Sequence, residues 1–328
     1  MAGMDMSKYL GLLRWSLKYN DGTSPSDVKA MDPERRAWLK EALESQVVDP
    51  ADMMKNIIKM LQIPRAESAS ETQEKEYAEA MVAALRALQE WVEQIDWAAD
   101  LHKLGGFETV INLTQDQDDG VRCMALEVFA TVVQNNPVTQ AWAMELGALE
   151  KIMSNMDLSQ GKTVTKEEQA KVLLATASLV RDYTPATVAF IKDYAGVAWL
   201  MKIIQEEKFS EKAHHKSLFF MRYIFSSVPA IKIALADKIT QTLNQTMLST
   251  NIDIQENSLH LLLAIYSDKN AISKITDATR QATAAAIEQY KPDGEDDFSA
   301  PLVKDLSAKL SAYPMQDTSS EAPVLLGN

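Results

Sequence analysis

Four histidines are the first side chains to consider for metal binding or acid–base chemistry, at positions 102, 214, 215 and 260. His214 and His215 are adjacent, so on a helix they project about 100° apart and cannot clamp one metal ion together. No acidic cluster follows either of them at helical spacing. A partly exposed helix face is the better interpretation of this pair.

Cys123 is the single cysteine of the chain. A lone cysteine excludes a disulfide framework and a cysteine-based zinc site. It lies beside Arg122 in an amphipathic segment, where a reactive thiol is conceivable but a packed, inert one is the commoner case. The sequence favours the inert interpretation.

The remaining chemical motifs are incomplete or missing. The segment "DQDDG" at 116–120 resembles part of a calcium loop, but the later acidic residue of an EF-hand loop is absent. An acidic turn between helices explains it better. The sequence contains no glycine-rich phosphate loop and no nucleophile-elbow motif. We therefore expect a protein that is not an enzyme and that holds neither a metal ion nor a cofactor.

Charge narrows the class of partner. The chain of 328 residues carries 33 basic and 46 acidic residues, a net charge of −13. A field of that sign repels phosphate backbones and anionic lipid, so nucleic acid and membrane surfaces are poor partners and a basic or mixed-charge protein surface is a better one. The start, "MAGMDMSKYLGLLRW", does not resemble a signal peptide, and no apolar run is long enough for a membrane span. We expect a cytoplasmic protein.

A repeated pattern positions the side chains. Gly106, Gly147 and Gly196 are 41 and 49 residues apart, and three prolines at 137, 185 and 229 are 48 and 44 apart. Each unit predicts a short helix, a glycine, a second helix, a polar turn and a long third helix. The glycine allows a sharp turn that needs positive φ or no Cβ. Helical repeats of about 40–47 residues are typical of armadillo and HEAT solenoids.

The predicted fold class is therefore all-α, an armadillo-like right-handed superhelical solenoid of about four repeats with a helical N-terminal extension. Residues 1–30 are expected to be a flexible segment with a short amphipathic helix, and 31–66 a helical pair. The armadillo domain is expected over 76–290. An acidic tail follows over 291–328 and is expected to be disordered or loosely attached, with one possible short helix, "LVKDLSAKLSAY", at 302–313.

The long third helices present a possible binding line opposite their buried stripes, at positions 0, +4, +7 and +11. This line consists of Cys123, Glu127, Ala130 and Gln134, then Lys171, Ala175, Ser178 and Asp182, then Lys216, Phe220, Tyr223 and Ser227. Periodicity alone explains it equally well as a solvated helix face. Phe220 and Tyr223 favour binding, because exposed aromatic and arginine side chains are typical of interface hot spots.

Several segments in series also resemble a known family. They include "IDWAADLHKLGGFETVI", "VRCMALEVFATVVQNNP", "SLVRDYTPATVAFIKDYAGVAWLMKII" and "HHKSLFFMRYIFSSVP". Over about residues 8–270 the chain resembles the Fes-type, or Hsp70-binding-protein, nucleotide exchange factors of the 70-kDa heat-shock chaperone. Endoplasmic-reticulum members of that family carry a signal peptide, so the resemblance is to the cytosolic branch.

The resemblance implies a monomeric armadillo protein whose concave face wraps one lobe of the ATPase domain of a cytosolic Hsp70. Binding displaces the other lobe and lets ADP leave, because the factor prefers the opened domain to the closed one. The resemblance also implies that the N-terminal segment, residues 1–30, helps free substrate from the chaperone.

The candidate partner contacts carried over from the resemblance begin with Arg181 of "LVRD" and Lys216 of "HHKSLFF". The others, from the same motifs and the same helix line, are Asn135, Asn136, Arg222, Tyr223, Lys171 and Glu127.

The alternative function is an armadillo adaptor or scaffold that binds extended peptides. Such grooves carry tryptophans on their third helices, each with an asparagine four residues later. The six tryptophans of this chain, at 15, 38, 91, 97, 142 and 199, fall outside the predicted third helices, which makes the adaptor the weaker hypothesis.

Overall fold

Helices are the only regular elements in the part of the chain that the structure describes. The computed structural model describes residues 32–34, 36–38, 50–66, 70–156, 164–291 and 298–313. The chain divides into two units, 1–53 and 54–328. The amphipathic helix predicted within 1–30 lies outside the described residues, and of the helix predicted after Pro33 only 33–34 and 36–38 are described, as helix.

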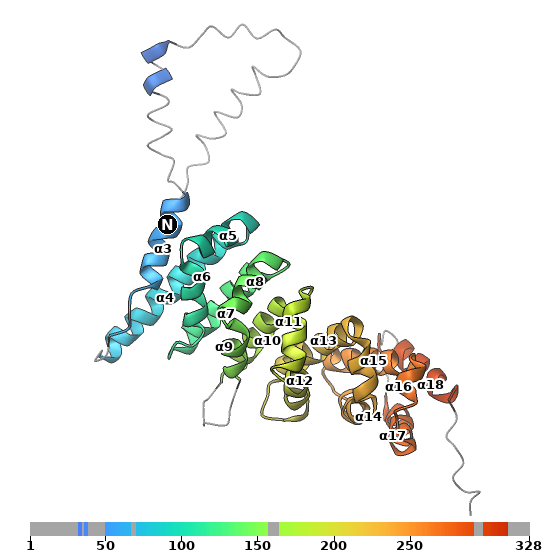
Figure 1. Ribbon diagram of the computed structural model, residues 1–328. Helices are drawn as coiled ribbons and strands as arrows, with labels where there is room; N and C mark the ends of the chain where they lie inside the picture. Colours follow the sequence, from blue (N-terminus) through green and yellow to red (C-terminus); the bar gives the residue numbers. More distant parts are fainter. Residues whose placement is uncertain are drawn as a thin grey trace, which may run out of the picture. The chain divides into compact units, whose positions relative to one another are not determined.

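Three consecutive repeats have the predicted pattern of two short helices and one long one (Figure 1). The first consists of α5 (Ile95–Lys103), α6 (Gly106–Leu113) and α7 (Asp119–Val133). The second consists of α8 (Pro137–Glu145), α9 (Ala148–Ser154) and α10 (Lys166–Val180). The third consists of α11 (Thr184–Lys192), α12 (Gly196–Gln205) and α13 (Glu211–Ser227).

Further helices extend the row at both ends. Before the repeats come α3 (Pro50–Leu61) and α4 (Glu71–Val92). After them come α14 (Pro229–Thr246), α15 (Ile252–Tyr266), α16 (Lys269–Ile272), α17 (Asp277–Gln289) and α18 (Ala300–Ser311). α14 takes the place of the two short helices of a repeat, and its sequence contains no glycine to divide it.

The long helices stack in chain order. Contacts join α4 to α7, α7 to α10, α10 to α13, α13 to α15 and α15 to α18. One hydrophobic cluster runs from Met54 to Leu306 through every repeat. No repeat buries its apolar stripe alone, so each neighbour completes the core of the last. The predicted all-α solenoid is confirmed.

The start of the solenoid differs from expectation, because the polar segment before residue 76 belongs to the folded part. Ser70 caps α4 in a capping box with Gln73, so the helix begins at Glu71. Arg65 forms ion pairs with Glu74 on α4 and with Asp116 in the turn between α6 and α7. These contacts attach the segment after α3 to α4 and to the first full repeat.

The tail predicted to be disordered from residue 291 contains a packed helix, so that prediction is wrong for 300–313. Val303 and Leu306 of α18 are buried in the core beside α15. Burying an aliphatic side chain of this kind contributes about 1.5–3 kcal/mol to the stability of the fold. This gain explains why the helix packs on the core although an acidic segment precedes it. Residues 292–297 and 314–328 lie outside the described residues.

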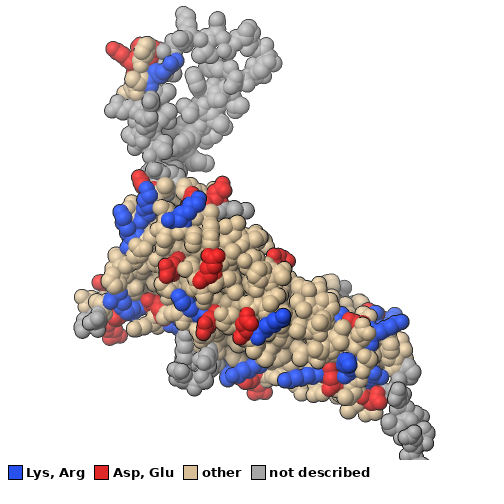
Figure 2. All heavy atoms as spheres, in the orientation of Figure 1, with Lys and Arg blue, Asp and Glu red and all other residues tan. Residues whose placement is uncertain are grey.

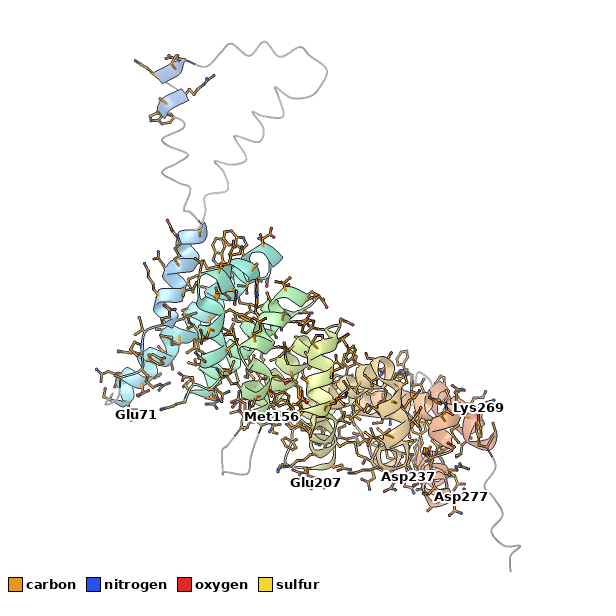
Figure 3. The ribbon with its side chains drawn as sticks, in the orientation of Figure 1. Glu71, Met156, Glu207, Asp237, Lys269 and Asp277 are labelled. Carbon is orange, nitrogen blue, oxygen red and sulfur yellow. The ribbon has the colours of Figure 1, made fainter. Side chains whose placement is uncertain are left out.

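A hydrogen bond joins α14 to the start of α17. Asp237 of α14 accepts the backbone N–H of Thr276 at 2.8 Å, which places the start of α17 at Asp277 beside α14 (Figure 3). Partial burial alone would raise the pKa of Asp237. Hydrogen bonds from this N–H and from the side chains of Thr279, Thr276 and Gln241 outweigh the effect of burial, so the pKa is lowered.

The aligned glycines serve two different purposes. The left-handed residue between the short helices is Gly105 (φ 76°) in the first repeat, Gly147 (φ 68°) in the second and Ala195 (φ 49°) in the third. Gly196 instead begins α12, and a Cβ there would lie 2.3 Å from the Phe190 ring. A Cβ at Gly106 would lie 2.4 Å from the Leu101 side chain. The three glycines aligned in the sequence are therefore not equivalent. Gly147 supplies a positive φ, whereas Gly106 and Gly196 lie where a side chain would not fit.

Replacing Ala195 by glycine should raise the free energy of unfolding by about 1 kcal/mol, because an alanine in the left-handed region is strained. Gly196→Ala should lower it by more, on the order of 2 kcal/mol, because the new methyl group would meet the Phe190 ring. Urea unfolding of both variants measures the two effects. An Ala195→Gly variant no more stable than the parent would contradict the strain at residue 195.

Candidate functional site

The exposed face of the long helices is displaced from the predicted line. We define the long-helix face as the solvent-facing sides of α7, α10 and α13. On α13 it carries Lys216, Phe219 and Tyr223, whereas Phe220 is 1% exposed and stacks on Phe190 at 5.1 Å between centroids. The prediction that Phe220 is an exposed aromatic is wrong.

The same displacement occurs on the two preceding long helices. On α10 the face carries Lys171, Leu174, Ala177 and Arg181. The predicted members Ala175 and Ser178 are buried there, as are Cys123 and Ala130 on α7. Because 3.6 residues make a turn, spacings of three and four both remain near one side of a helix, and packing decides which residue turns outward.

A pocket of about 230 Å³ lies between α10 and α13 on the long-helix face. Four of the eight predicted contacts line it: Asn135, Arg181, Lys216 and Tyr223. Its other lining residues are Gln134, Leu173, Leu174, Ala177, Ser178, Phe219 and Phe220. We call it the α10–α13 pocket.

Phe219 is the residue of this pocket that the sequence reasoning missed. Its ring is 48% exposed, so it forgoes part of the stabilising free energy that full burial of a phenylalanine side chain contributes. It lies three residues after Lys216 and four before Tyr223, and this spacing is the signal that could have identified it.

Arg181 lies over two of the three aromatic rings that line this pocket. Its guanidinium carbon is 5.5 Å from the centroid of Tyr223 and 5.8 Å from that of Phe219, so both rings attract the cation. Tyr223 is held in turn, because its hydroxyl accepts the backbone N–H of Asp182 at 2.8 Å. α10 ends at Val180, Arg181 is extended at φ −67° and ψ 135°, and Asp182 with φ 59° continues the turn away from the helix.

The backbone that carries Arg181 is fixed by the first short helix of the same repeat. The buried side-chain amide of Gln140, on α8, donates to the carbonyls of Ser178, Leu179 and Arg181 at 3.0, 3.1 and 2.9 Å. These carbonyls end α10 and have few partners within the helix. The position of Arg181 is therefore set by the stacking of α8 on α10.

Lys216 is the cation at the other side of the pocket. Partial burial, followed by the charges of Lys212 and Lys171, lowers the pKa of its ammonium group. Among the described residues it has no hydrogen-bond or ion-pair partner. Lys171, by contrast, forms an ion pair with Glu127 at 2.5 Å, so these two predicted contacts are joined to each other.

The last two predicted contacts lie apart from the pocket. Asn136 is 8% exposed and caps α8 by accepting the N–H of Thr139, so its side chain serves the fold. Arg222 donates to the side chain of Asn257 on α15 at 2.8 Å. It lines a neighbouring cavity of about 300 Å³ that includes Lys232 and His260.

The groups first considered for chemistry are occupied by packing. Burial first, and then the charges of Glu168, Glu167 and Asp119, raise the pKa of Cys123 to about 12, and the side chain is buried, as expected of a packed cysteine. His102 stacks on Trp142 with ring centroids 4.0 Å apart. Among the described residues no group of three or more His, Cys, Asp or Glu could hold a metal ion.

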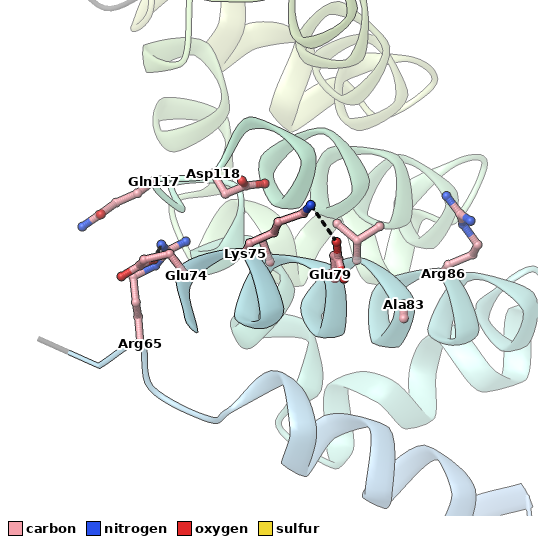
Figure 4. Close-up of a pocket in the computed structure, with 10 residues that line it drawn as sticks. Arg65, Glu74, Lys75, Glu79, Ala83, Arg86, Gln117 and Asp118 are labelled. Carbon is pink, nitrogen blue, oxygen red and sulfur yellow. Dashed lines mark hydrogen bonds and ion pairs between the residues drawn. The ribbon is translucent and has the colours of Figure 1, made fainter. Parts of the chain in front are cut away.

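A second depression of about 630 Å³ lies along α4, near the turn between α6 and α7 (Figure 4). Its charged side chains are largely paired with each other. Arg65 pairs with Glu74 and Asp116, and Lys75 is 3.9 Å from Glu79. Arg86 also lines the depression and has no ion-pair partner among the described residues, so the charges there are partly compensated.

Charges of both signs are scattered over the face shown in Figure 2, with wide uncharged areas between them. The acidic residues thus do not form one continuous acidic patch on that face. None of the described helices is long and apolar enough to cross a membrane.

The fold is shared with solved armadillo proteins. A computationally designed armadillo repeat protein made for modular peptide recognition superposes with a TM-score of 0.56 at 14% identity, over 80% of this chain and 100% of that one. An engineered protein superposes with a TM-score of 0.61 at 15% identity, over 81% of this chain and 100% of that one. At these identities the likeness concerns the fold alone.

Several relatives match most of the chain. Hsp70-binding protein 1 of Homo sapiens is 25% identical over 263 residues, covering 79% of this chain and 71% of the relative. The Hsp70 nucleotide exchange factor FES1 of Eremothecium gossypii is 22% identical over 301 residues, covering 88% of this chain and 97% of the relative. Nucleotide exchange factor SIL1 of Mus musculus is 33% identical over 168 residues, covering 51% of this chain and 33% of the relative.

Two family models match adjoining parts of the chain. The model described as "Nucleotide exchange factor Fes1" matches residues 10–101. The model described as "SIL1/FES1/HPBP1 C-terminal domain" matches residues 97–221, which include the α10–α13 pocket from Gln134 to Phe220. The resemblance found in the sequence is confirmed, and the chain belongs to the SIL1/FES1/HPBP1 family of nucleotide exchange factors.

Proposed function

We propose that this chain binds the ATPase domain of an Hsp70 through the long-helix face, the concave face expected of an armadillo repeat, and promotes release of ADP. The observation that carries the proposal is the α10–α13 pocket. There Arg181 of "LVRD" and Lys216 of "HHKSLFF" lie with the rings of Phe219 and Tyr223 on one surface. Arginine and aromatic side chains of this kind are typical hot spots of protein interfaces.

The activity follows from differential affinity and needs no catalytic group. If the factor binds the opened ATPase domain more tightly than the closed, nucleotide-filled one, it lowers nucleotide affinity by the same factor. A ligand with equal affinity for both states would shift nothing. In this proposal the hydrogen-bonded turns and the continuous hydrophobic core keep the long-helix face in one conformation while the ATPase domain opens.

The partner in this proposal is a cytosolic Hsp70, and the chain acts as a monomer. The cytosolic assignment rests on the branch of the family that the sequence resembles. The relatives that match most of the chain have Hsp70 in their names. The proposed exchange factor is not an enzyme, since the chemistry of ATP hydrolysis belongs to the chaperone.

The adaptor alternative has less support from the structure. α7, α10 and α13 contain no tryptophan. Trp91 does lie on a stacked long helix, α4, but it is partly buried and packs edge-to-face on Trp97 at 5.7 Å. Residue 95, four positions later, is an isoleucine, so the pattern of peptide-binding grooves is missing there.

The protein should accelerate the release of a fluorescently labelled ADP from the ATPase domain of a cytosolic Hsp70. Binding of the opened domain lowers nucleotide affinity, so the release rate should rise with factor concentration and saturate. Stopped-flow fluorescence measures this rate. The proposal would be abandoned if micromolar protein left the rate unchanged for several such chaperones.

Charge reversal of Arg181 should weaken the complex by about tenfold or more, because hot-spot arginines contribute about 1.4 kcal/mol or more. Arg181 is exposed, so the melting temperature of Arg181→Glu should change little. Isothermal titration with the ATPase domain and circular dichroism measure the two quantities. Lys202→Glu, an exposed charge reversal on α12, is the matched control and should bind as the parent does. A large fall in melting temperature would make Arg181 a structural residue.

A further inference from the structure

We propose that the α10–α13 pocket is the receptor for one carboxylate side chain of the ATPase domain, which enters between Lys216 and Arg181 with Phe219 as the apolar wall of its entrance. The inference rests on the proposed function and adds the chemistry of the group that this pocket recognises.

The first argument is the absence of a counter-charge. In the described part of the chain, several other partly buried cations are paired with carboxylates: Arg65 with Glu74 and Asp116, Arg122 with Glu168, Lys232 with Asp268 and Arg280 with Asp277. Two more, Arg222 and Lys151, donate to the side-chain amide oxygens of Asn257 and Asn112. Lys216 has no such partner there, and Arg181 faces aromatic rings. In a chain with net charge −13, two cations without carboxylates at one pocket favour an acidic group from outside.

The second argument is the cost of this arrangement. Lys216 is partly withdrawn from water and lies near the like charges of Lys212 and Lys171, and together these effects lower its pKa. Neutral side chains of the same length would avoid both costs. An incoming carboxylate would offset them, because a charge pair in a partly dry pocket is stronger than one in water.

The third argument is shape. The pocket has about 230 Å³ of space and apolar walls from Leu174, Ala177 and the exposed ring of Phe219. Ligand sites for small molecules are usually larger, about 300–1,000 Å³. The space suits a single acidic side chain whose methylene groups lie against the apolar wall and whose oxygens reach the two cations.

The larger depression along α4 shows the contrast. Arg65 and Lys75 there already have acidic partners within the chain, as Figure 4 shows for Lys75 and Glu79. Arg86 has no ion-pair partner among the described residues, but it is exposed, so a carboxylate beside it would gain only a contact screened by water. The partly buried Lys216 of the α10–α13 pocket therefore offers an acidic group more.

Lys216→Met is the test variant, because methionine keeps most of the side-chain packing and removes the charge. We expect its melting temperature to be equal to or above that of the parent, and its dissociation constant for the ATPase domain to rise about tenfold or more. Lys212→Met, an exposed lysine one turn earlier on the same helix, is the matched control and should change affinity less than about twofold. The parent complex treated with a carbodiimide, which joins an amine to a carboxylate in direct contact, should yield a cross-link from Lys216 to an aspartate or glutamate of the chaperone.

The outcomes separate this inference from the proposed function. If the parent accelerates ADP release while Lys216→Met binds as tightly as the parent, or while carbodiimide cross-links exclude Lys216, the carboxylate receptor is wrong and the exchange function stands. If Lys216→Met loses both stability and affinity, Lys216 is a structural residue and the inference is also wrong. A parent that does not accelerate ADP release overturns the proposed function and this inference together.

Discussion

A buried ion pair between Arg122 and Glu168 joins the first two full repeats of the solenoid. The guanidinium donates to both carboxylate oxygens of Glu168, at 2.7 and 2.8 Å, and to the carbonyls of Asp116 and Gln117 at 2.9 and 2.8 Å. Breaking such a pair by removing one partner costs about 3–5 kcal/mol, because the other charge stays buried alone. The pair therefore fixes α7 against α10 and also fixes the turn that begins α7.

Neutral side chains continue the same kind of contact along the row. Gln140 satisfies the end of α10, Asn155 donates to the carbonyl of Thr114 at 2.9 Å, and Gln169 accepts the N–H of Ser210 at 2.9 Å. Each contact joins a side chain to the backbone at the end or start of another helix, where carbonyl and N–H groups lack partners within the helix. The first lies within the second repeat, and the other two join neighbouring repeats. The register between α10 and α13 follows from these contacts, and with it the spacing of Arg181 and Lys216 across the pocket.

The sequence was sufficient for the fold because the repeat period, the prolines and the helix caps are local signals. It was not sufficient for the site, because Phe219 and Phe220 differ only in which one meets Phe190, and that contact joins different helices of the repeat. The aligned glycines concealed Ala195 for a similar reason, since backbone conformation and crowding by Phe190 call for the same residue type. The packing of helix α18 on the core was not expected, because its surroundings are acidic, although Val303 and Leu306 have helical spacing.

The distribution of paired and unpaired cations separates structural from functional charge in this molecule. Where a cation serves the fold, as Arg122 does, the chain supplies the carboxylate and both groups are buried. At the α10–α13 pocket the chain supplies aromatic rings and apolar walls but leaves the counter-charge out. A rigid stack can maintain such a pocket because Gln140 and Tyr223 fix the backbone around Arg181. In the proposed complex little binding energy is then needed to order the factor, and more is left to favour the opened state of the chaperone.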